Sequence, residues 1–181
     1  PLPEAKPKSS RKLLFYLVST AIVGCFLLAL VYSYTIAYHN SNTFKLSLDK
    51  ACSEQTGADA SVNYLKVGAN HSDARSVSWV WNDDASFLQS LELKKLSSTH
   101  FPGSLLSFNW KPSEVTANKG SLYLNLDSPN KLNLRGMLGN SVEGLSCSDL
   151  SVYKVSESKA FIEGVSVKLQ AASTSPKISF S

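Results

Sequence analysis

The sequence predicts a mainly β fold in which an N-terminal transmembrane helix and a short amphipathic helix precede an antiparallel β-sheet. Two observations carry this prediction. Leu13–Tyr38 contains no Asp, Glu, Lys, Arg or His, and from Ala60 onward apolar and polar residues alternate with a period of two. Because an alternating strand buries one face and exposes the other, we expect a one-sided sheet that is curved and able to form a groove.

The uncharged stretch is long enough to cross a membrane. At a rise of ~1.5 Å per residue, Leu13–Tyr38 makes a helix of about 39 Å, and the hydrocarbon core of a bilayer is roughly 30 Å thick. Tyr32, Tyr34 and Tyr38 suit the level of the headgroups. An uncleaved anchor is therefore favoured over a buried core helix, and over a cleaved signal peptide, whose apolar region runs only about 7–15 residues.

The charges around this helix predict its orientation. Glu4 is the one acidic residue before the helix, against four basic residues: Lys6, Lys8, Arg11 and Lys12. The positive-inside rule places this end in the cytoplasm. The chain then divides into a cytoplasmic tail (1–12), the anchor (13–38), a linker with a short helix (39–59) and an exocytoplasmic β-domain (60–181). Small or weakly polar residues within the anchor offer one face to a partner transmembrane helix: Ser19, Thr20 and Gly24.

Most of the net charge of +4 belongs to the cytoplasmic tail. Without the four basic residues and one acidic residue of that tail, 14 basic and 13 acidic residues remain. A nearly neutral domain without a basic stripe argues against nucleic-acid binding. The last residues, Lys177–Ser181, have the alternation of a strand, so we expect the chain to be part of a longer protein.

A short amphipathic helix is predicted between the anchor and the first strand. The polar segment His39–Thr43 offers N-cap residues, and Gly57 is a suitable C-terminal stop. Five residues fall at helical spacing: Phe44, Leu48, Ala51, Cys52 and Gln55. Two alternatives are a continuation of the membrane helix and a helix lying on the membrane surface.

The strands are predicted from short alternating segments. One face of a strand carries Trp79 and Trp81, whose large side chains we expect to be buried. Leu105–Trp110 is a further short apolar run. The other strands are centred on apolar pairs or triplets: Val62 and Tyr64; Leu91 and Leu93; Leu122, Leu124 and Leu126; Leu132 and Leu134; Tyr153 and Val155; Val165, Val167 and Leu169; Ile178 and Phe180.

The cysteines leave two alternatives open. Cys25 lies within the predicted membrane helix, where it is expected to pack. Cys52 and Cys147 would face a compartment in which disulfides persist, and a bond between them would close a long loop. The alternative is two separate buried thiols.

No catalytic, metal or cofactor motif is found. His39, His71 and His100 fall in predicted loops without the spacing of a zinc site, and a solvated turn is favoured over a metal site for His71 and Asp73. The chain has no G-x-S-x-G motif, P-loop or Rossmann glycine pattern. We therefore expect a non-enzymatic protein with no cofactor.

The order of elements resembles the N-terminal part of the AsmA-like proteins of bacterial envelopes, a group that includes TamB-type proteins. A single anchor leads to a helix ending at Thr56–Gly57, then to Val62–Leu65 and a succession of one-sided strands. The rhythm of three segments is similar to theirs: Val77–Trp81, Phe87–Leu93 and Ser121–Leu126. This chain departs from the family in being short, since the family's grooves contain several times more strands.

The resemblance implies a location in the bacterial inner membrane, with the β-domain in the periplasm, and a role in lipid transfer or envelope assembly. The expected partners are membrane lipid and other envelope proteins. The residues expected to contact lipid or a partner lie on two strands: Leu122, Leu124, Leu126, Val165, Val167 and Leu169. The alternative is a structural subunit whose apolar faces close on each other and which docks on a larger membrane or secretion complex.

Overall fold

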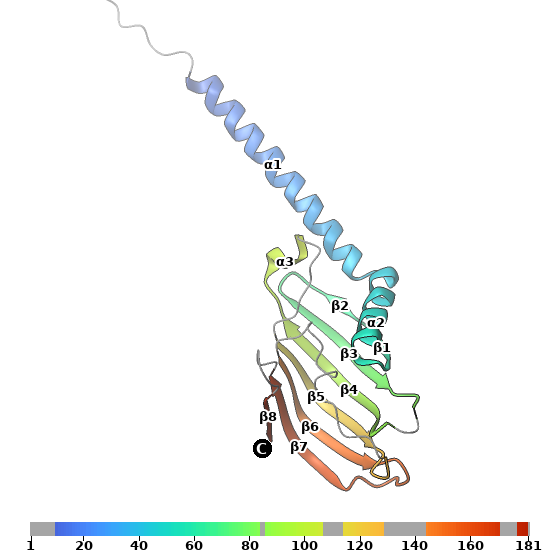
Figure 1. Ribbon diagram of the computed structural model, residues 1–181. Coiled ribbons are helices and arrows are strands. Elements are labelled where there is room, and N and C mark those ends of the chain that lie inside the picture. Colours follow the sequence, from blue (N-terminus) through green and yellow to red (C-terminus); the bar gives the residue numbers. More distant parts are fainter. Residues whose placement is uncertain (1–9, 84–85, 107–113, 129–143, 171–176, 181) are drawn as a thin grey trace, which may run out of the picture.

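The computed structural model describes residues 10–83, 86–106, 114–128, 144–170 and 177–180. The chain forms a long helix, a second helix and a single open sheet (Figure 1). The elements follow in this order: α1 (Ser10–His39), α2 (Asn42–Thr56), β1 (Asp59–Asn63), β2 (Lys66–Val67), β3 (His71–Val80), β4 (Leu88–Thr99), α3 (Pro102–Leu106), β5 (Glu114–Leu124), β6 (Gly144–Lys154), β7 (Ile162–Gln170) and β8 (Lys177–Phe180).

The two long helices are separate elements. The described part of the chain has one helix long and apolar enough to span a membrane, over Leu13–His39. After a break at Asn40, Ser41 caps α2 by accepting a hydrogen bond from the Phe44 amide, with N···Oγ 3.2 Å. Gly57 ends α2 in the left-handed conformation with φ 68°, which glycine adopts without strain. Both predicted ends of the short helix are confirmed.

The eight strands form one sheet in the order β1-β3-β4-β5-β6-β7-β8, with β2 pairing with β3. All neighbouring pairs are antiparallel except β5 and β6, which are parallel. The predicted mainly β, mostly antiparallel sheet is confirmed, and the parallel pair is a correction. A parallel pair needs a long connection, and the one between β5 and β6 contains residues 129–143.

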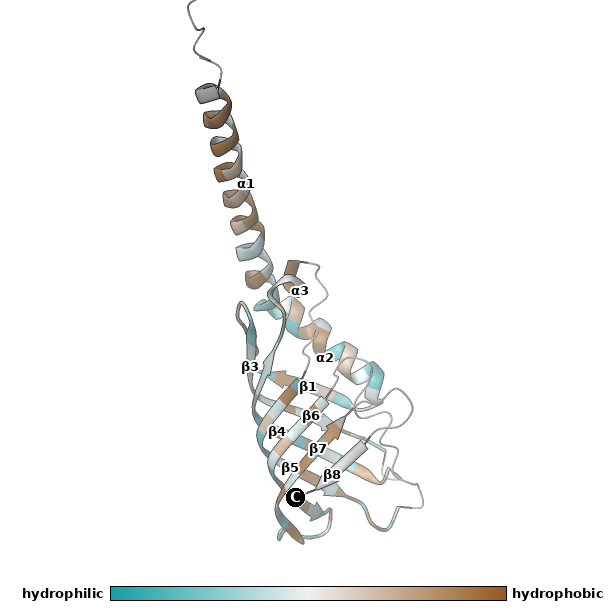
Figure 2. Cartoon of the chain, turned by 90° about the vertical axis from the view of Figure 1, so that its left-hand side faces the viewer, coloured by the Kyte–Doolittle hydropathy of each residue, from teal (hydrophilic) through white to brown (hydrophobic). Residues whose placement is uncertain are grey.

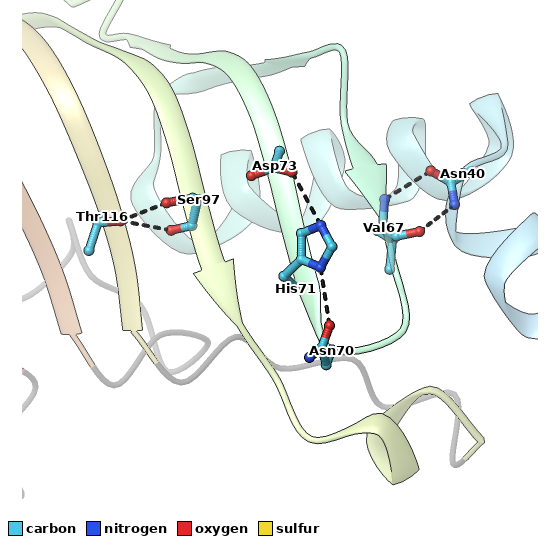
Figure 3. A network of polar contacts seen from close by, with 7 residues as sticks. All are labelled: Asn40, Val67, Asn70, His71, Asp73, Ser97 and Thr116. Atoms are coloured by element: carbon cyan, nitrogen blue, oxygen red, sulfur yellow. Dashed lines mark hydrogen bonds and ion pairs between the residues drawn. The ribbon is translucent and has the colours of Figure 1, made fainter.

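The directly paired residues align apolar side chains in four rows across one face of the sheet, which we call the apolar face. The rows follow the strand register: Ala60, Trp79, Leu91, Leu122, Val152 and Ile162; Val62, Val77, Leu93, Gly120, Leu150 and Val165; Ala74, Leu96, Ala117, Cys147 and Val167; Ser72, Ser98, Val115, Leu145 and Leu169. The opposite face is polar, and there the hydroxyls of Ser97 and Thr116 lie 2.8 Å apart (Figure 3).

A line of irregularities crosses the four central strands at one level. On each strand the alternation is interrupted by two consecutive residues, so that apolar residues three apart share the apolar face. The interrupting pairs are Arg75–Ser76 on β3, Lys94–Lys95 on β4, Asn118–Lys119 on β5 and Ser148–Asp149 on β6. Lys95 has a positive φ of 53°. Extra residues of this kind bend strands, and because all four strands carry one, their register is preserved.

One prediction, on α2, is corrected, and two other predicted segments lie partly or wholly outside the described residues. The apolar run that begins at Leu105 is helical up to Leu106, as part of α3, while its remainder and the predicted strand at Leu132 and Leu134 lie outside the described residues. On α2, Ala51 and Gln55 are exposed. Some half-buried positions of α2 are polar because this helix also forms hydrogen bonds to the edge of the sheet. The half-buried positions are Phe44, Lys45, Leu48, Asp49, Cys52, Ser53 and Thr56.

Candidate apolar binding face

The centre of the apolar face is a packed core on β3, β4 and β5. Val77, Leu93 and Leu96 are buried there, and Leu93 is only 2% exposed. Trp79 and Trp81 are partly buried and pack against this core, as predicted. The Trp81 indole also donates a hydrogen bond to the Thr56 carbonyl, with Nε1···O 3.3 Å, which ties the end of α2 to the sheet.

Gly120 lies in the middle of this face on β5. A Cβ at this position would lie 2.7 Å from Leu150 Cδ1 and 3.0 Å from Leu93 Cδ2. Leu93 and Leu150 belong to the two neighbouring strands, β4 and β6, so their side chains converge over β5. The two leucines thus fill the space over Gly120, and only glycine leaves room for both of them.

Helix α2 covers one end of the apolar face and satisfies the free edge of β1. Leu48 packs against the core. Asp49 Oδ1 accepts a hydrogen bond from the Val62 amide at 2.7 Å, and Ser53 Oγ accepts one from the Ala60 amide at 2.8 Å. The spacings match, because four helical residues rise about 6 Å and two strand residues about 6.7 Å. An edge that could otherwise pair with another chain is thus closed.

Burial decreases from the α2 end of the apolar face toward β7. Val62, Leu91 and Leu93 are buried on β1 and β4. On β5, β6 and β7 four residues of the rows are buried as well: Ala117, Cys147, Val152 and Val167. The others there are half-buried or exposed: Leu122, Leu145, Leu150, Val165, Leu169 and Ile162. Within the described part of the chain, Leu48 is the helical residue that packs against the core. The apolar rows therefore continue beyond the region that α2 covers.

The structure brings five of the six predicted contact residues onto this face. Leu122 lies on β5, while Val165, Val167 and Leu169 lie on β7 in register with apolar residues of β6. Leu124 is the last residue of β5 and is half-buried. Leu126 is a correction: it lies in the turn after β5 and is 47% exposed. The turn begins there because the Asn125 side chain accepts a hydrogen bond from the Asp127 amide, which mimics a backbone turn.

Cys52 and Cys147 are both free thiols. Cys52 is on α2, beside β1, and Cys147 is on β6, four strand positions away in the sheet order. At about 4.8 Å per strand this separation is roughly 19 Å, far beyond the reach of a disulfide. The predicted pairing is therefore not present. Burial raises the pKa of both thiols, and the Asp49 carboxylate adds to the increase for Cys52. For Cys147 the Asp149 backbone hydrogen bond lowers the pKa and the Asp149 carboxylate raises it, and burial keeps the pKa above its ordinary value.

The polar face carries dispersed charges. Its ion pairs are exposed, such as Lys168 with Glu114 at 3.0 Å and Lys119 with Asp149 at 3.7 Å. His71 Nε2 lies 3.7 Å from Asp73 Oδ2 in an exposed position (Figure 3). Among the described residues, no group of three or more His, Cys, Asp or Glu side chains could hold a metal ion. The feature of the domain with the clearest binding chemistry is thus its apolar face.

No family model, curated protein or solved structure matches this chain. The resemblance to AsmA-like proteins therefore stays a prediction from the order and pattern of the sequence. The structural basis for a function is therefore the set of apolar rows, their partial cover by α2 and the position of α1.

The row pattern had a signal in the sequence that alternation alone does not capture. Apolar or small residues three apart flank a polar pair on four strands: Ala74 and Val77, Leu93 and Leu96, Ala117 and Gly120, Cys147 and Leu150. A strict period of two assigns the members of each pair to opposite faces. If each polar pair is read as containing one extra residue in its strand, the two flanking apolar residues fall on the same face.

Proposed function

We propose that this chain is a single-pass membrane protein whose β-domain holds acyl chains of membrane lipid against its apolar face. The observation that carries the proposal is the continuation of the apolar rows over β5, β6 and β7, past the part covered by α2. Contiguous apolar surface is rarely left in water. A protein anchored in a bilayer has acyl chains beside it as the nearest apolar material.

The proposal treats α1 as an uncleaved anchor and not as a signal sequence. It is supported by Thr35 and His39, which lie within the apolar helix and are nevertheless fully buried. Removal of the helix would take these packed residues away from the domain. The excess of basic residues before Leu13 supports a cytoplasmic N-terminus. The resemblance stated above supports a bacterial inner membrane and a periplasmic β-domain.

Within this proposal the domain acts by binding, in lipid transfer or envelope assembly, and needs neither a cofactor nor a catalytic group. The second candidate is a structural subunit that docks its apolar face on another membrane or secretion protein. The convergence of Leu93 and Leu150 over Gly120 favours this alternative, because a face that already packs on itself offers a firm surface to a protein partner.

Photo-crosslinking separates the two candidates. A photoreactive residue is placed in the full chain at Leu145 or Leu169, which are half-buried on the apolar face, and at exposed Lys168 of the polar face as a control. Val167 is less suitable because it is buried. We expect crosslinks to phospholipid in membranes from positions 145 and 169 and none from 168. Crosslinks only to protein would favour the docking subunit, and equal labelling at all three positions would contradict both.

A further inference from the structure

The C-terminal end of α1 is packed against other parts of the chain. Its residues are exposed from Leu13 to Val31 with few exceptions, but one stripe of the last two turns is covered. This stripe consists of Tyr32, Thr35, Ile36 and His39, which lie at the spacing of one helix face. The domain therefore begins beside the apolar helix and not after it.

The turn between β2 and β3 runs back along this stripe. Asn40 bonds both backbone groups of Val67: its Nδ2 donates to the carbonyl at 2.8 Å, and its Oδ1 accepts from the amide at 2.9 Å (Figure 3). Farther along the helix, the Tyr32 hydroxyl donates to the Ala69 carbonyl at 3.0 Å. Eight helical residues separate the two contacts, about 12 Å along the axis. Val67 and Ala69 are two residues apart and span at most about 7 Å, so the turn runs along α1 toward Tyr32, whose long side chain reaches it.

This arrangement fixes the level at which the hydrocarbon must end. A non-helical turn is not tolerated where lipid surrounds it, so the bilayer core on this side ends near Tyr32. The nineteen residues from Leu13 to Val31 rise about 28 Å, close to the roughly 30 Å of a bilayer core. The membrane-spanning segment is then shorter than the uncharged stretch that ends at Tyr38.

A second segment of the domain lies at the same level. The His100 amide donates to the Asn70 carbonyl at 3.1 Å, which places the end of β4 beside the β2–β3 turn. Helix α3 follows directly and lies next to α1 (Figure 1). Figure 2 shows apolar residues in α3 beside the end of α1. Leu105 is fully buried, whereas Phe101 is 79% exposed and Leu106 is 41% exposed.

We propose that Phe101 and Leu106 are a second membrane contact of this protein, inserted at the boundary between the headgroups and the acyl chains. Aromatic residues are enriched at this depth, and Tyr34, also exposed, occupies the same level on α1. Two contacts at separate points limit how the domain can tilt about its anchor. The inference rests on the membrane anchor of the proposed function, but not on lipid binding by the apolar face.

The test places the photoreactive amino acid benzoylphenylalanine in the full chain, reconstituted in phosphatidylcholine vesicles. The probe positions are Phe101 and, independently, Leu106. Leu27, exposed in the middle of α1, tests the anchor. Phe161 is the matched control, because it is an exposed phenylalanine, 48% accessible, in the turn between β6 and β7 at the opposite end of the domain. We expect lipid crosslinks from 27, 101 and 106, at least fivefold above those from 161.

Each result has a distinct consequence. Lipid crosslinks from 27 but not from 101 and 106, or crosslinks from these two only to protein, would overturn the second contact and leave the anchor intact. Absence of lipid crosslinks from 27 would overturn the anchor and with it the second contact. Crosslinks from 101 and 106 without any from Leu145 and Leu169 would support the second contact while contradicting lipid binding by the apolar face.

Discussion

The two halves of the apolar face have the same rows of side chains but different cover. Over β1, β3 and β4 much of the rows is buried, Leu48 of α2 packs against this core, and α2 closes the edge of β1 through Asp49 and Ser53. Over β5, β6 and β7 the rows continue, yet large side chains such as Leu145 and Leu169 are only half-buried. The two halves thus share one pattern of side chains and differ in how completely the largest of them are buried. In the proposed function, the first half supplies stability and the second half binds lipid.

The largest expected contrast between the halves is in stability. We expect Leu93→Ala to lower the free energy of unfolding by about 2–5 kcal/mol, the usual cost for a buried leucine. Leu145→Ala, the same change on the half-buried side, is expected to cost about 1 kcal/mol. Thermal unfolding of the full chain in detergent, followed by the circular dichroism of the sheet, measures both. Equal losses of stability would mean that the two halves of the apolar face are equally buried, and would contradict the difference between them.

The join between the halves is tested at Gly120. We expect Gly120→Val to cost about 1–3 kcal/mol, because the new side chain meets Leu150 and Leu93. Ser121→Val changes the next residue, which points to the polar face, and is the control; its effect is expected to be within about 0.5 kcal/mol. If Gly120→Val melted like the wild type, Leu93 and Leu150 would not be packed over Gly120.

The cover of the first half is tested at Asp49. Asp49→Ala leaves the Val62 amide without its acceptor, at an expected cost of about 1–3 kcal/mol. Asp49→Asn keeps an acceptor oxygen and should restore most of the stability. Glu54→Ala, on the exposed side of α2 in an exposed pair with Lys50, should change little. A loss with Glu54→Ala equal to that with Asp49→Ala would show that the edge bond is not what holds α2.

The smallest expected effect concerns Cys52 and Cys147, one thiol in each half. Burial raises the pKa of both, so the folded state favours the neutral thiol. The stabilisation is present below the ordinary thiol pKa of about 8.5 and is lost as pH rises through the folded value. We expect slow alkylation of both cysteines in the folded chain and a melting temperature that falls above about pH 9. Rapid alkylation of Cys147 at neutral pH would place it outside the core.

The sequence predicted the main elements because each has a strong local signal. The apolar run of α1, the caps of α2 at Ser41 and Gly57, and the alternation around Trp79 follow from helix and strand physics. The line of extra residues, including Lys95 with its positive φ, depends on neighbouring strands sharing an irregularity, which no single segment reveals. The parallel pairing of β5 and β6 is likewise a property of the whole sheet.

The candidate site was predictable in composition but not in extent. The alternation identified Leu122, Val165 and Val167 as members of an apolar face, and the register placed them in rows. Leu126 lies outside the strand because the turn at Asn125 begins first. The sequence also could not show that the turn after Val67 and helix α3 lie beside α1, because these contacts join segments far apart in the chain.

Counting bound lipid measures directly whether the half of the apolar face on β5, β6 and β7 holds acyl chains. The full chain is extracted from membranes in a mild detergent, and its retained phospholipid is measured by native mass spectrometry. The double variant Leu145→Ser/Leu169→Ser is compared with Thr116→Ala/Lys168→Ala on the polar face, after both are shown to melt as folded proteins. We expect the apolar-face variant to lose at least half of the retained lipid while the polar-face variant keeps it. Equal retention by both variants would contradict lipid binding by the apolar face.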